Sequence, residues 1–460
     1  MANNSYMTSP PASENMPAGV PYILGNEMGE RFSFYGTRCI LVVFMTKFLL
    51  DRSGASAPMT DEDAKRWFHL FISAVYFMPL AGALLSDLWL GKYRTILWFS
   101  VLYCFGFAAL ALDQTRVGLF LGIALVAVGS GMIKPCVSAN VGDQFGHANK
   151  HLMAKVYSWF YFSINVGAFT AQFLVCPYLL EHSRFGPGWA FGVPAVVMAL
   201  ATFVFWLGRK KFVHIPANGA QFVRECFSRD AVLSLARLAV LYVFVAMFWA
   251  LFDQMDSAWV LQAEKMNRTV LHWETAGGKV FEWTLLSSQI AAVNPLMILI
   301  LIPTFSLVIY PAINKVFPLT ALRKISIGLF VASGAFIVSG WIETRLAAGE
   351  QPGVAWLILA HAIIAAAEVM VSITCLEFSY TQAPKKMKSF IMAVFLLSVS
   401  LGNLFTAIVN TVIRNADGTS KLSGAGYFWF FSGMMIATAV VFVPVAMGYK
   451  VRNYIQDEGT

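Results

Sequence analysis

Charged residues are scarce in this chain of 460 residues, where Asp, Glu, Lys and Arg together make up only 13%. The apolar and aromatic types Ala, Val, Ile, Leu, Met, Phe, Trp, Tyr and Cys make up 58%, and the mean hydropathy is +0.65. Ordinary soluble domains carry about 25% charged residues. These proportions exclude a soluble globular protein and predict an integral membrane protein that crosses the bilayer many times.

Cysteines are also few, and they form no pattern. The six cysteines are scattered, without a C-x-x-C pair or a Cys/His ligand spacing, which argues against a disulfide framework and a metal centre. The hydrolase motifs H-E-x-x-H and G-x-S-x-G do not occur either. We therefore expect neither an enzyme nor a metal protein.

Lysine and arginine are missing from residues 1–20, which are polar and rich in proline. This composition excludes a cleavable signal peptide and predicts a cytoplasmic N-terminal tail, followed by a first span that acts as its own insertion signal. Along the rest of the chain, Lys and Arg are more frequent on the segments that a cytoplasmic N-terminus would place inside, so both termini are expected in the cytoplasm. The net charge of +8 then reflects topology and attraction to the membrane surface, and no nucleic acid is needed to explain it.

Apolar windows of about 20 residues, enough to cross roughly 30 Å of hydrocarbon, predict an all-α membrane protein with twelve transmembrane helices. The windows cover 24–50, 66–86, 94–112, 117–140, 153–180, 188–207, 231–262, 285–313, 323–342, 353–381, 388–413 and 425–449. The longest inner loop, 208–230, separates six spans from six. We expect two six-helix bundles, 21–207 and 231–460, joined by a cytoplasmic linker. This is the plan of the major facilitator fold, in which two bundles rock around a site near the bilayer midplane.

The inner segment GALLSDLWLGKYRT, between spans two and three, resembles the inner-loop signature of that superfamily. The matching residues are Gly82, Asp87, Gly91, Lys92 and Arg94. Glycine permits a tight turn and close helix approach, and the acid can pair with a neighbouring base or a helix end. The alternative is a generic charged turn.

The largest outer loop covers residues 264–284. Its apolar residues alternate on both sides of AGGK, which predicts a small β-hairpin. No soluble domain fits elsewhere in the chain. The function is therefore expected to lie inside the membrane.

Four charged residues share one face of the first span: Glu27, Glu30, Arg31 and Arg38. Each charge at the centre of a membrane helix costs about 2.5 to 3.5 kcal/mol on insertion scales, so these four must be paired or line a wet cavity. A charge-paired stripe that helps the helices assemble is one explanation. A transport pathway is favoured because polar residues recur in other spans.

The fourth and fifth spans hold three of these polar residues. Lys134 lies late in span four, where a buried lysine requires a partner, unless it extends to the inner surface. Tyr161 and Asn165 share a side of span five. They can orient a peptide backbone or an ion, and an aromatic packing face with one interhelical hydrogen bond is equally compatible with the pattern.

The remaining spans add further candidates. Trp249 and Asp253 share a face of span seven, and Glu368 lies in the middle of span ten; acids this deep in a membrane are functional by default. Asn294 precedes a proline in span eight, where a structural kink and a ligand contact are equally compatible. His69 lies near the outer end of span two. The usual pKa of histidine, about 6.5, suits proton exchange, and a structural role is the alternative.

Three groups of residues together resemble the proton-coupled oligopeptide transporter family. They are Glu27-x-x-Glu30-Arg31-Phe32-x-Phe34-Tyr35 in span one, FYFSINVG in span five, and FWALFDQ with LEFSYTQAP in the second half. FWALFDQ and EVMVSITCLEFSYTQAP are most similar to the animal intestinal-type branch. The loop ETRLAAGEQPG is nevertheless too short for the extracellular domain of that branch, and the central linker is too short for the extra helix pair of bacterial members.

The resemblance implies a proton-coupled symporter that imports di- and tripeptides by alternating access. Protons would be the coupling ion, with no other cofactor. The protein would work as a monomer in the plasma membrane, with a bacterial inner membrane as the expected location. A symporter of the same family that carries nitrate or an amino acid is the alternative.

The resemblance also implies roles for the residues that match. Proton coupling would involve Glu27, Glu30, Arg31, Lys134, Asp253 and His69. Peptide binding would involve Arg31, Tyr35, Tyr76, Lys134, Tyr161, Asn165, Trp249, Asn294 and Glu368. Arg31 and Lys134 would attract the peptide carboxylate, Glu368 would accept the amino terminus, and Arg38 with Asp253 would form an outer gate. Phe34 replaces a tyrosine of the family, and Phe395 stands where relatives often have tryptophan, so side-chain selectivity need not match.

Overall fold

A computed structural model describes most of the chain. The described residues are 6–182, 184–217, 219, 229–274, 280–382, 388–415, 420–422 and 424–449. The chain divides into two compact units. Unit 1 comprises Met1–Ile40, Phe48–Ala57 and Ala74–Val232, and unit 2 comprises Leu41–Lys47, Pro58–Ser73 and Leu233–Thr460.

Helices dominate the described residues, as the sequence predicted. Eleven helices in this part of the chain are long and apolar enough to cross a membrane. The first predicted span is also helical: α1 (Val20–Val43) continues through η1 (Phe44–Phe48) and begins at Val20 rather than at residue 24. It falls outside the eleven because of the charged residues that it carries. The twelve predicted spans therefore all correspond to helices.

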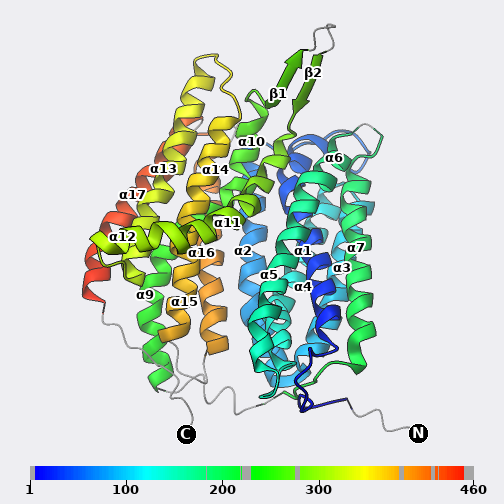
Figure 1. The fold of residues 1–460 in the computed structure, drawn as a ribbon. Helices are drawn as coiled ribbons and strands as arrows, with labels where there is room; N and C mark the ends of the chain where they lie inside the picture. The colour runs from blue at the N-terminus through cyan, green and yellow to red at the C-terminus, as the bar shows by residue number, and fades with distance from the viewer. Residues whose placement is uncertain are drawn as a thin grey trace. The chain divides into compact units, whose positions relative to one another are not determined.

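The elements that the structure describes in unit 1 are all helical. They are α1, the second half of α2 (Asp61–Leu85), η2 (Ser86–Leu90), α3 (Lys92–Leu112), α4 (Arg116–Asp143), η3 (Lys150–Leu152), α5 (Met153–Phe169), η4 (Thr170–Val175), α6 (Cys176–Glu181), α7 (Pro187–Leu207) and η5 (Gly208–Lys210). Helix α3 packs along both α4 and α7 (Figure 1). A Cβ on Gly129 of α4 would lie only 2.7 Å from the Cβ of Tyr103. The absence of a side chain thus allows α3 and α4 to approach closely.

Unit 2 contains the other helices and the only sheet of the described residues. Its elements are the first half of α2, α9 (Arg229–Phe252), η6 (Asp253–Asp256), α10 (Ala258–Glu264), β1 (Thr269–Glu274), β2 (Val280–Thr284), η7 (Ser287–Ala292), α11 (Val293–Thr304), η8 (Phe305–Ile309), α12 (Tyr310–Val316), α13 (Ala321–Ala347), α14 (Ala355–Glu368), η9 (Val369–Ile373), α15 (Thr374–Gln382), α16 (Lys388–Val412) and α17 (Ala425–Gly448). Helix α13 packs against α14 and α17. The ring of Phe336 lies 5.6 Å from Trp259 and 6.1 Å from Phe431, centroid to centroid. These buried rings form part of the core of unit 2.

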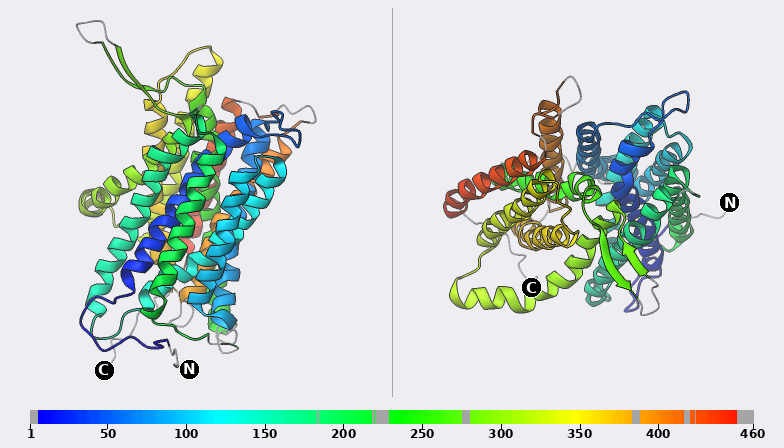
Figure 2. Two further views of the ribbon diagram at one scale, coloured as in Figure 1. Left: turned by 90° about the vertical axis from the view of Figure 1, so that its right-hand side faces the viewer. Right: turned by 90° about the horizontal axis from the view of Figure 1, so that it is seen from above.

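One helical segment of unit 2 lies crosswise to its neighbours. Figures 1 and 2 show α11, η8 and α12 running across the direction of α9, α13 and α14. Ile298 and Phe305 of this segment pack against Ala365, Val369 and Met370. This apolar contact joins α11 and η8 to α14 and η9.

The outer loop forms the predicted hairpin. Strands β1 and β2 pair antiparallel, with Leu271 opposite Trp283 and Trp273 opposite Phe281. The turn, residues 275–279, lies outside the described residues. The hairpin projects beyond the ends of α10 and α13 (Figure 2).

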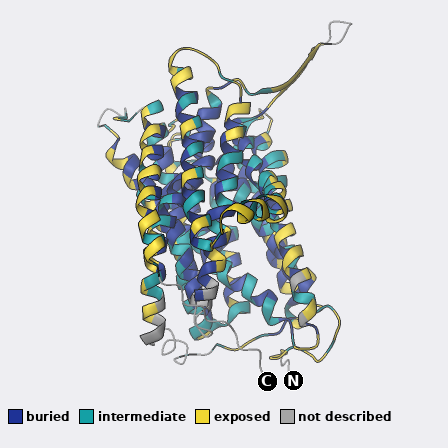
Figure 3. Cartoon of the chain, turned by 60° about the vertical axis from the view of Figure 1, so that its left-hand side comes forward, coloured by how far each residue is buried: buried dark blue, intermediate teal, exposed yellow. Residues whose placement is uncertain are grey.

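Exposed residues lie along the outer faces of the helices (Figure 3), and many of them are large and apolar. Examples are Phe105 at 62%, Leu121 at 53%, Leu200 at 58%, Val243 at 60% and Val440 at 55% exposure. So much exposed apolar surface would be unfavourable in water. On helices of spanning length it is the surface expected to contact lipid.

Candidate functional site

Helix α1 carries a buried ion-pair cluster within unit 1. The guanidinium Nε of Arg31 lies 2.7 Å from Oε1 of Glu27 and 3.2 Å from Oε2 of Glu30. Glu27 and Arg31 are one helical turn apart, which brings their side chains together. Both acids are only 1% exposed. One guanidinium therefore faces two carboxylates away from water, and a second cation is needed to balance them.

Lys134 of α4 supplies the second cation, although it forms no ion pair with the residues that the structure describes. Its Nζ lies 4.2 Å from the centroid of the Phe34 ring and 5.5 Å from that of Tyr76. This nitrogen is buried and has no hydrogen-bond partner among the described residues. It interacts electrostatically with Glu27 and Glu30. The lysine is thus held by aromatic faces near the acids, which leaves its donors available to a ligand.

Two members of this cluster were not predicted as site residues. Ser130 donates from Oγ to Oε1 of Glu30 at 3.2 Å. It precedes Lys134 by one helical turn, and this spacing was a usable signal. Phe34 was noted only as a departure from the tyrosine of the family. An aromatic ring of either kind offers a π face to a cation.

The other predicted residues of unit 1 lie on α1 and α5. Tyr35 packs edge-on against Phe34, with the ring centroids 5.4 Å apart, so it joins the cluster around Lys134. On α5, Nδ2 of Asn165 donates to the backbone carbonyl of Tyr161 at 2.8 Å. Because that bond occupies a donor within the helix, the side-chain oxygen is the group of Asn165 best suited to a ligand.

A chain of hydrogen bonds connects Asp253 to His69 within unit 2. Asn403 of α16 donates from Nδ2 to Oδ2 of Asp253 at 2.5 Å, and its Oδ1 lies 2.7 Å from Nδ1 of His69. Nε2 of His69 lies 3.0 Å from Oγ of Ser257. Asp253 is 1% exposed and the other three residues are 0% exposed. Residues from α2, η6, α16 and the turn before α10 thus form one buried polar path.

The asparagine determines which ring nitrogen of His69 carries a hydrogen. Its Nδ2 donates to the carboxylate of Asp253, so its Oδ1 faces the ring and can only accept. Nδ1 of His69 must therefore be the donor. In the neutral ring, Nε2 accepts from the hydroxyl of Ser257, and in the imidazolium it donates to that hydroxyl. Both ring nitrogens of His69 therefore keep a hydrogen-bond partner in either charge state, while the hydroxyl of Ser257 is free to donate to the carbonyl of Gln254 only when the ring is charged.

Asn403 and Ser257 were missed by the sequence analysis. Asn403 interrupts the apolar run SLGNLF, the same kind of signal that identified Asn294. His361 is a further histidine within a span. Its Nδ1 lies 2.9 Å from the carbonyl of Leu357, and its ring lies 4.6 Å from that of Trp259. These contacts place His361 in the core of unit 2 rather than on the polar path.

The predicted peptide-binding residues of unit 2 fall into two places. Nδ2 of Asn294 donates to Oε2 of Glu368 at 3.2 Å and lies 3.5 Å from the sulfur of Met255. Asn294 and Glu368 are therefore neighbours. Trp249 is 8% exposed and packs edge-on against Phe252, with centroids 5.1 Å apart. Its ring belongs to an aromatic cluster on α9.

The predicted gate pairs residues from different units. Arg38 is 3% exposed and lies on α1 in unit 1, whereas Asp253 belongs to unit 2. Their pairing stays a prediction. Among the residues that the structure describes, no group of three or more His, Cys, Asp or Glu side chains could hold a metal ion.

Known proteins resemble this chain in sequence. Residues 93–232 and 221–430 match the family model PTR2, which is described as the POT family. "Peptide transporter family 1" of Drosophila melanogaster is 33% identical over 374 residues, which cover 72% of this chain and 48% of the relative. "Solute carrier family 15 member 2" of Rattus norvegicus is 32% identical over 387 residues, which cover 74% and 51%. The chain spans about half the length of these curated relatives.

A solved structure resembles it along nearly its whole length. The crystal structure of an auto inhibited POT family peptide transporter matches with a TM-score of 0.84 and 34% sequence identity, and the match covers 96% of this chain and 99% of that one. This similarity confirms the predicted all-α fold of the major facilitator type.

Proposed function

Because the chain belongs to the POT family, we propose that it is a proton-coupled symporter that imports di- and tripeptides by alternating access. The relative of Drosophila melanogaster and the solved structure named above are described as peptide transporters. The observation that carries the proposal is the buried cluster in which Arg31 contacts Glu27 and Glu30 beside Lys134. Titratable acids paired with cations inside a membrane are typical of proton pathways.

The charges suit the two ends of a peptide. Arg31 and Lys134 offer cationic donors for the carboxylate, and Glu368 with Asn294 offers a polar site for the ammonium group. Every zwitterionic di- or tripeptide shares these ends, whatever its side chains. Aromatic and amide side chains would line the space between them. These are Tyr35, Tyr76, Tyr161, Asn165 and Trp249.

Competition for Arg31 gives a route for coupling. In the free protein the guanidinium is held by two carboxylates. Protonation of Glu30 or Glu27 would remove one of these charges and release Arg31 for the peptide carboxylate. Proton binding and peptide binding then favour each other, as thermodynamic linkage requires of a symporter.

The polar path of unit 2 would serve the gate. Asp253 is the proposed partner of Arg38 and is bonded to Asn403. A proton arriving at His69 or Asp253 would weaken the attraction between Asp253 and Arg38, and the outer gate could open. Because the hydroxyl of Ser257 can donate or accept, His69 can change charge while its Nε2 keeps a hydrogen-bond partner.

The charge distribution supports the proposed membrane topology. The excess of Lys and Arg on the predicted inner segments supports placing both termini in the cytoplasm, and the family resemblance supports the plasma membrane as the location. The two halves, 21–207 and 231–460, would be the bundles that rock, with 208–230 as their linker. A single chain supplies every proposed site residue, which supports a functional monomer.

Uptake into proteoliposomes tests the proposal. Glu30→Gln should abolish uptake of a labelled dipeptide driven by an inward proton gradient, while counterflow persists, because the peptide site remains but the proton site is lost. Glu274→Gln removes an exposed acid from β1 and should leave both activities unchanged. Gradient-driven uptake at the wild-type rate in Glu30→Gln contradicts the coupling role. Competition by nitrate or a free amino acid, but not by di- and tripeptides, would favour the alternative substrate.

A further inference from the structure

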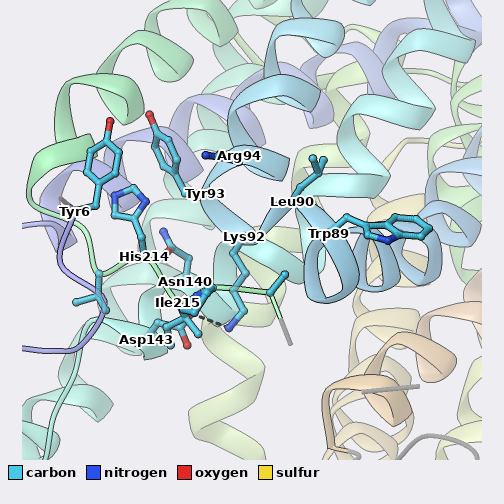
Figure 4. A pocket seen from close by; sticks show the side chains of 14 residues that line it. Tyr6, Trp89, Leu90, Lys92, Tyr93, Arg94, Asn140, Asp143, His214 and Ile215 are labelled. Carbon is cyan, nitrogen blue, oxygen red and sulfur yellow. Dashed lines mark hydrogen bonds and ion pairs between the residues drawn. The ribbon is translucent and has the colours of Figure 1, made fainter. Parts of the chain in front are cut away.

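A cavity of about 440 Å³ lies at the first turn of α3 in unit 1. Its walls come from four parts of the chain: the N-terminal tail, the segment Trp89–Arg94, the end of α4, and the stretch that follows η5. Figure 4 shows several of the lining side chains. None of them belongs to the cluster around Arg31, so the peptide-transport mechanism leaves this cavity without a role.

The tail and the stretch after η5 are docked by specific contacts. The backbone N–H of His214 donates to the carbonyl of Met7 at 2.7 Å, and that of Val213 donates to Oε1 of Gln144 at 3.0 Å. The ring of Tyr6 stacks on His214 with the centroids 4.2 Å apart. These contacts hold the N-terminal tail and the stretch after η5 in place as walls of the cavity.

The basic groups at this cavity outnumber its acid. Lys92 pairs with Asp143, the acid of the lining, at 2.7 Å, and Figure 4 marks this contact by a dashed line. Arg94 also lines the cavity and makes no ion pair with the residues that the structure describes. His214 adds no donor for an anion, because its Nε2 donates to the carbonyl of Arg209 at 2.7 Å and Nδ1 of the neutral ring can only accept. An anion entering here would meet an uncompensated guanidinium.

Uncharged donors converge on the same space. The first turn of α3 begins at Lys92, and its N-cap, Gly91, has φ +72° and no side chain that could accept from the first-turn N–H groups. Backbone N–H groups in such a first turn point out of the helix and favour anions. Independently, Asn140 is 2% exposed and lines the cavity, and its Nδ2 has no hydrogen-bond partner among the described residues. A buried donor left in this way is energetically unfavourable unless a ligand accepts from it.

The cavity also lies where a membrane span ends. The span Asp61–Leu90 stops beside it and the span Lys92–Leu112 begins there. Trp89 is 72% exposed at this point, and exposed tryptophans gather at membrane–water boundaries. In a bilayer crossed by these two spans, the phosphates of the lipid headgroups would lie near the same level.

We propose that this cavity binds a phosphate group, with Arg94, Asn140 Nδ2 and the first-turn N–H groups of α3 as its donors. The phosphate can belong to the headgroup of an anionic phospholipid or to a soluble phosphate monoester. Its tetrahedral oxygens accept from several directions at once, which matches donors contributed by a guanidinium, a carboxamide and a backbone. A bound phosphate also strengthens the docking of the tail, because Tyr6 and His214 form the wall of the same cavity.

Ligand-induced stabilisation of the full chain tests the proposal. The melting temperature is measured in nanodiscs of phosphatidylcholine with and without phosphatidylglycerol, and separately with glycerol 3-phosphate added in solution. A ligand that binds only the folded protein raises the melting temperature according to its concentration relative to its dissociation constant. Stabilisation by phosphatidylglycerol alone assigns the phosphate to lipid, and stabilisation by glycerol 3-phosphate assigns it to a soluble ester. No stabilisation of the wild type by either probe overturns the proposal.

Variants localise the effect. Arg94→Gln should weaken binding about tenfold, as expected for the loss of a charge-assisted bond. Asn140→Asp keeps the size of the side chain but replaces a donor with an anion, so it should abolish binding. Arg323→Gln changes a matched exposed arginine in the first turn of α13 and should bind as the wild type does. Circular dichroism without ligand shows whether each variant is folded. Equal ligand-induced shifts in folded Arg94→Gln, Asn140→Asp and wild type refute the site.

Discussion

Oδ1 of Asn403 and Nδ1 of His69 lie 2.7 Å apart, and this contact commits the histidine to one tautomer. The same asparagine donates to Asp253. A single uncharged side chain therefore connects a titratable ring to a titratable acid inside a membrane helix bundle. Removing it should affect both groups together.

Asn403→Leu should destabilise the protein by about 1 to 3 kcal/mol, because two buried polar groups lose a partner. It should also change the pH dependence of peptide uptake, since Nδ1 of His69 would no longer have its acceptor. Thermal unfolding and uptake measured between pH 5 and 8 give the two readouts.

A matched variant separates structure from coupling. Asn410 is another buried asparagine on α16, bonded to Thr406 and Tyr427. Asn410→Leu should destabilise the fold by a comparable amount while the pH profile keeps its shape. An unchanged pH profile in Asn403→Leu would argue against a proton role for the path.

Phe34→Leu should weaken peptide binding about twofold to thirtyfold, the range expected for a cation–π contact of about 0.5 to 2 kcal/mol. The reason is that Lys134 lies 4.2 Å from the ring that holds it. Phe34→Tyr should bind nearly as well as the wild type, because it keeps the aromatic face. Binding of a labelled dipeptide measures the effect. Phe107→Leu, on α3, controls for the loss of a buried ring, and equal affinity in Phe34→Leu and wild type would exclude this support for Lys134.

Glu368→Gln should reduce the preference for a free peptide amino terminus about tenfold, because the carboxylate beside Asn294 would lose its charge. The measurement compares competition by a dipeptide with competition by its N-acetylated form. The wild type should prefer the free amine, and the variant should treat the two nearly alike. A peptide amide that lacks the C-terminal carboxylate serves as a control, since its weaker binding should persist in the variant. Full discrimination by Glu368→Gln would transfer the role to another acid.

The docking of the N-terminal tail should weaken in acid. Burial lowers the pKa of His214, against the opposing hydrogen bond to the carbonyl of Arg209, and the charge of Arg94 lowers it further. Because the pKa is lower in the docked state, the undocked state binds more protons. The docking contribution is complete above the usual pKa of about 6.5 and is lost as the pH falls through the lowered pKa.

Hydrogen exchange at the backbone amide of His214, which donates to Met7, measures this loss after correction for intrinsic exchange. Protection should fall between pH 7.5 and pH 5. His214→Phe keeps a ring to stack on Tyr6 and should remove the pH dependence. Constant protection in the wild type would show that His214 does not control the docking.

Local periodicity made much of the fold predictable. Each apolar window is long enough to cross a bilayer by itself, so the spans could be placed without knowing their neighbours. The cluster of Glu27, Glu30 and Arg31 was equally accessible, because residues three and four apart on a helix share a face. The hairpin followed from alternating apolar residues around a turn.

The distant contacts could not be obtained in this way. His69 and Asn403 are separated by 334 positions, and nothing in either local sequence identifies the other as its partner. The same limit applies to Lys134. Its need for a partner was evident, but only the packing of α1 against α4 decides that its nearest support is the ring of Phe34.

The sequence by itself determined that this is a helical membrane protein with acids and bases inside its spans, because hydropathy, helix period and the energetics of burying charge act over short stretches. Only the tertiary structure decided which of those groups meet. It linked Asp253 to His69 through Asn403, set Asn294 against Glu368, and enclosed the cavity at Arg94 and Asn140 with the N-terminal tail. Such contacts depend on how whole helices pack, and packing is a property of the complete chain.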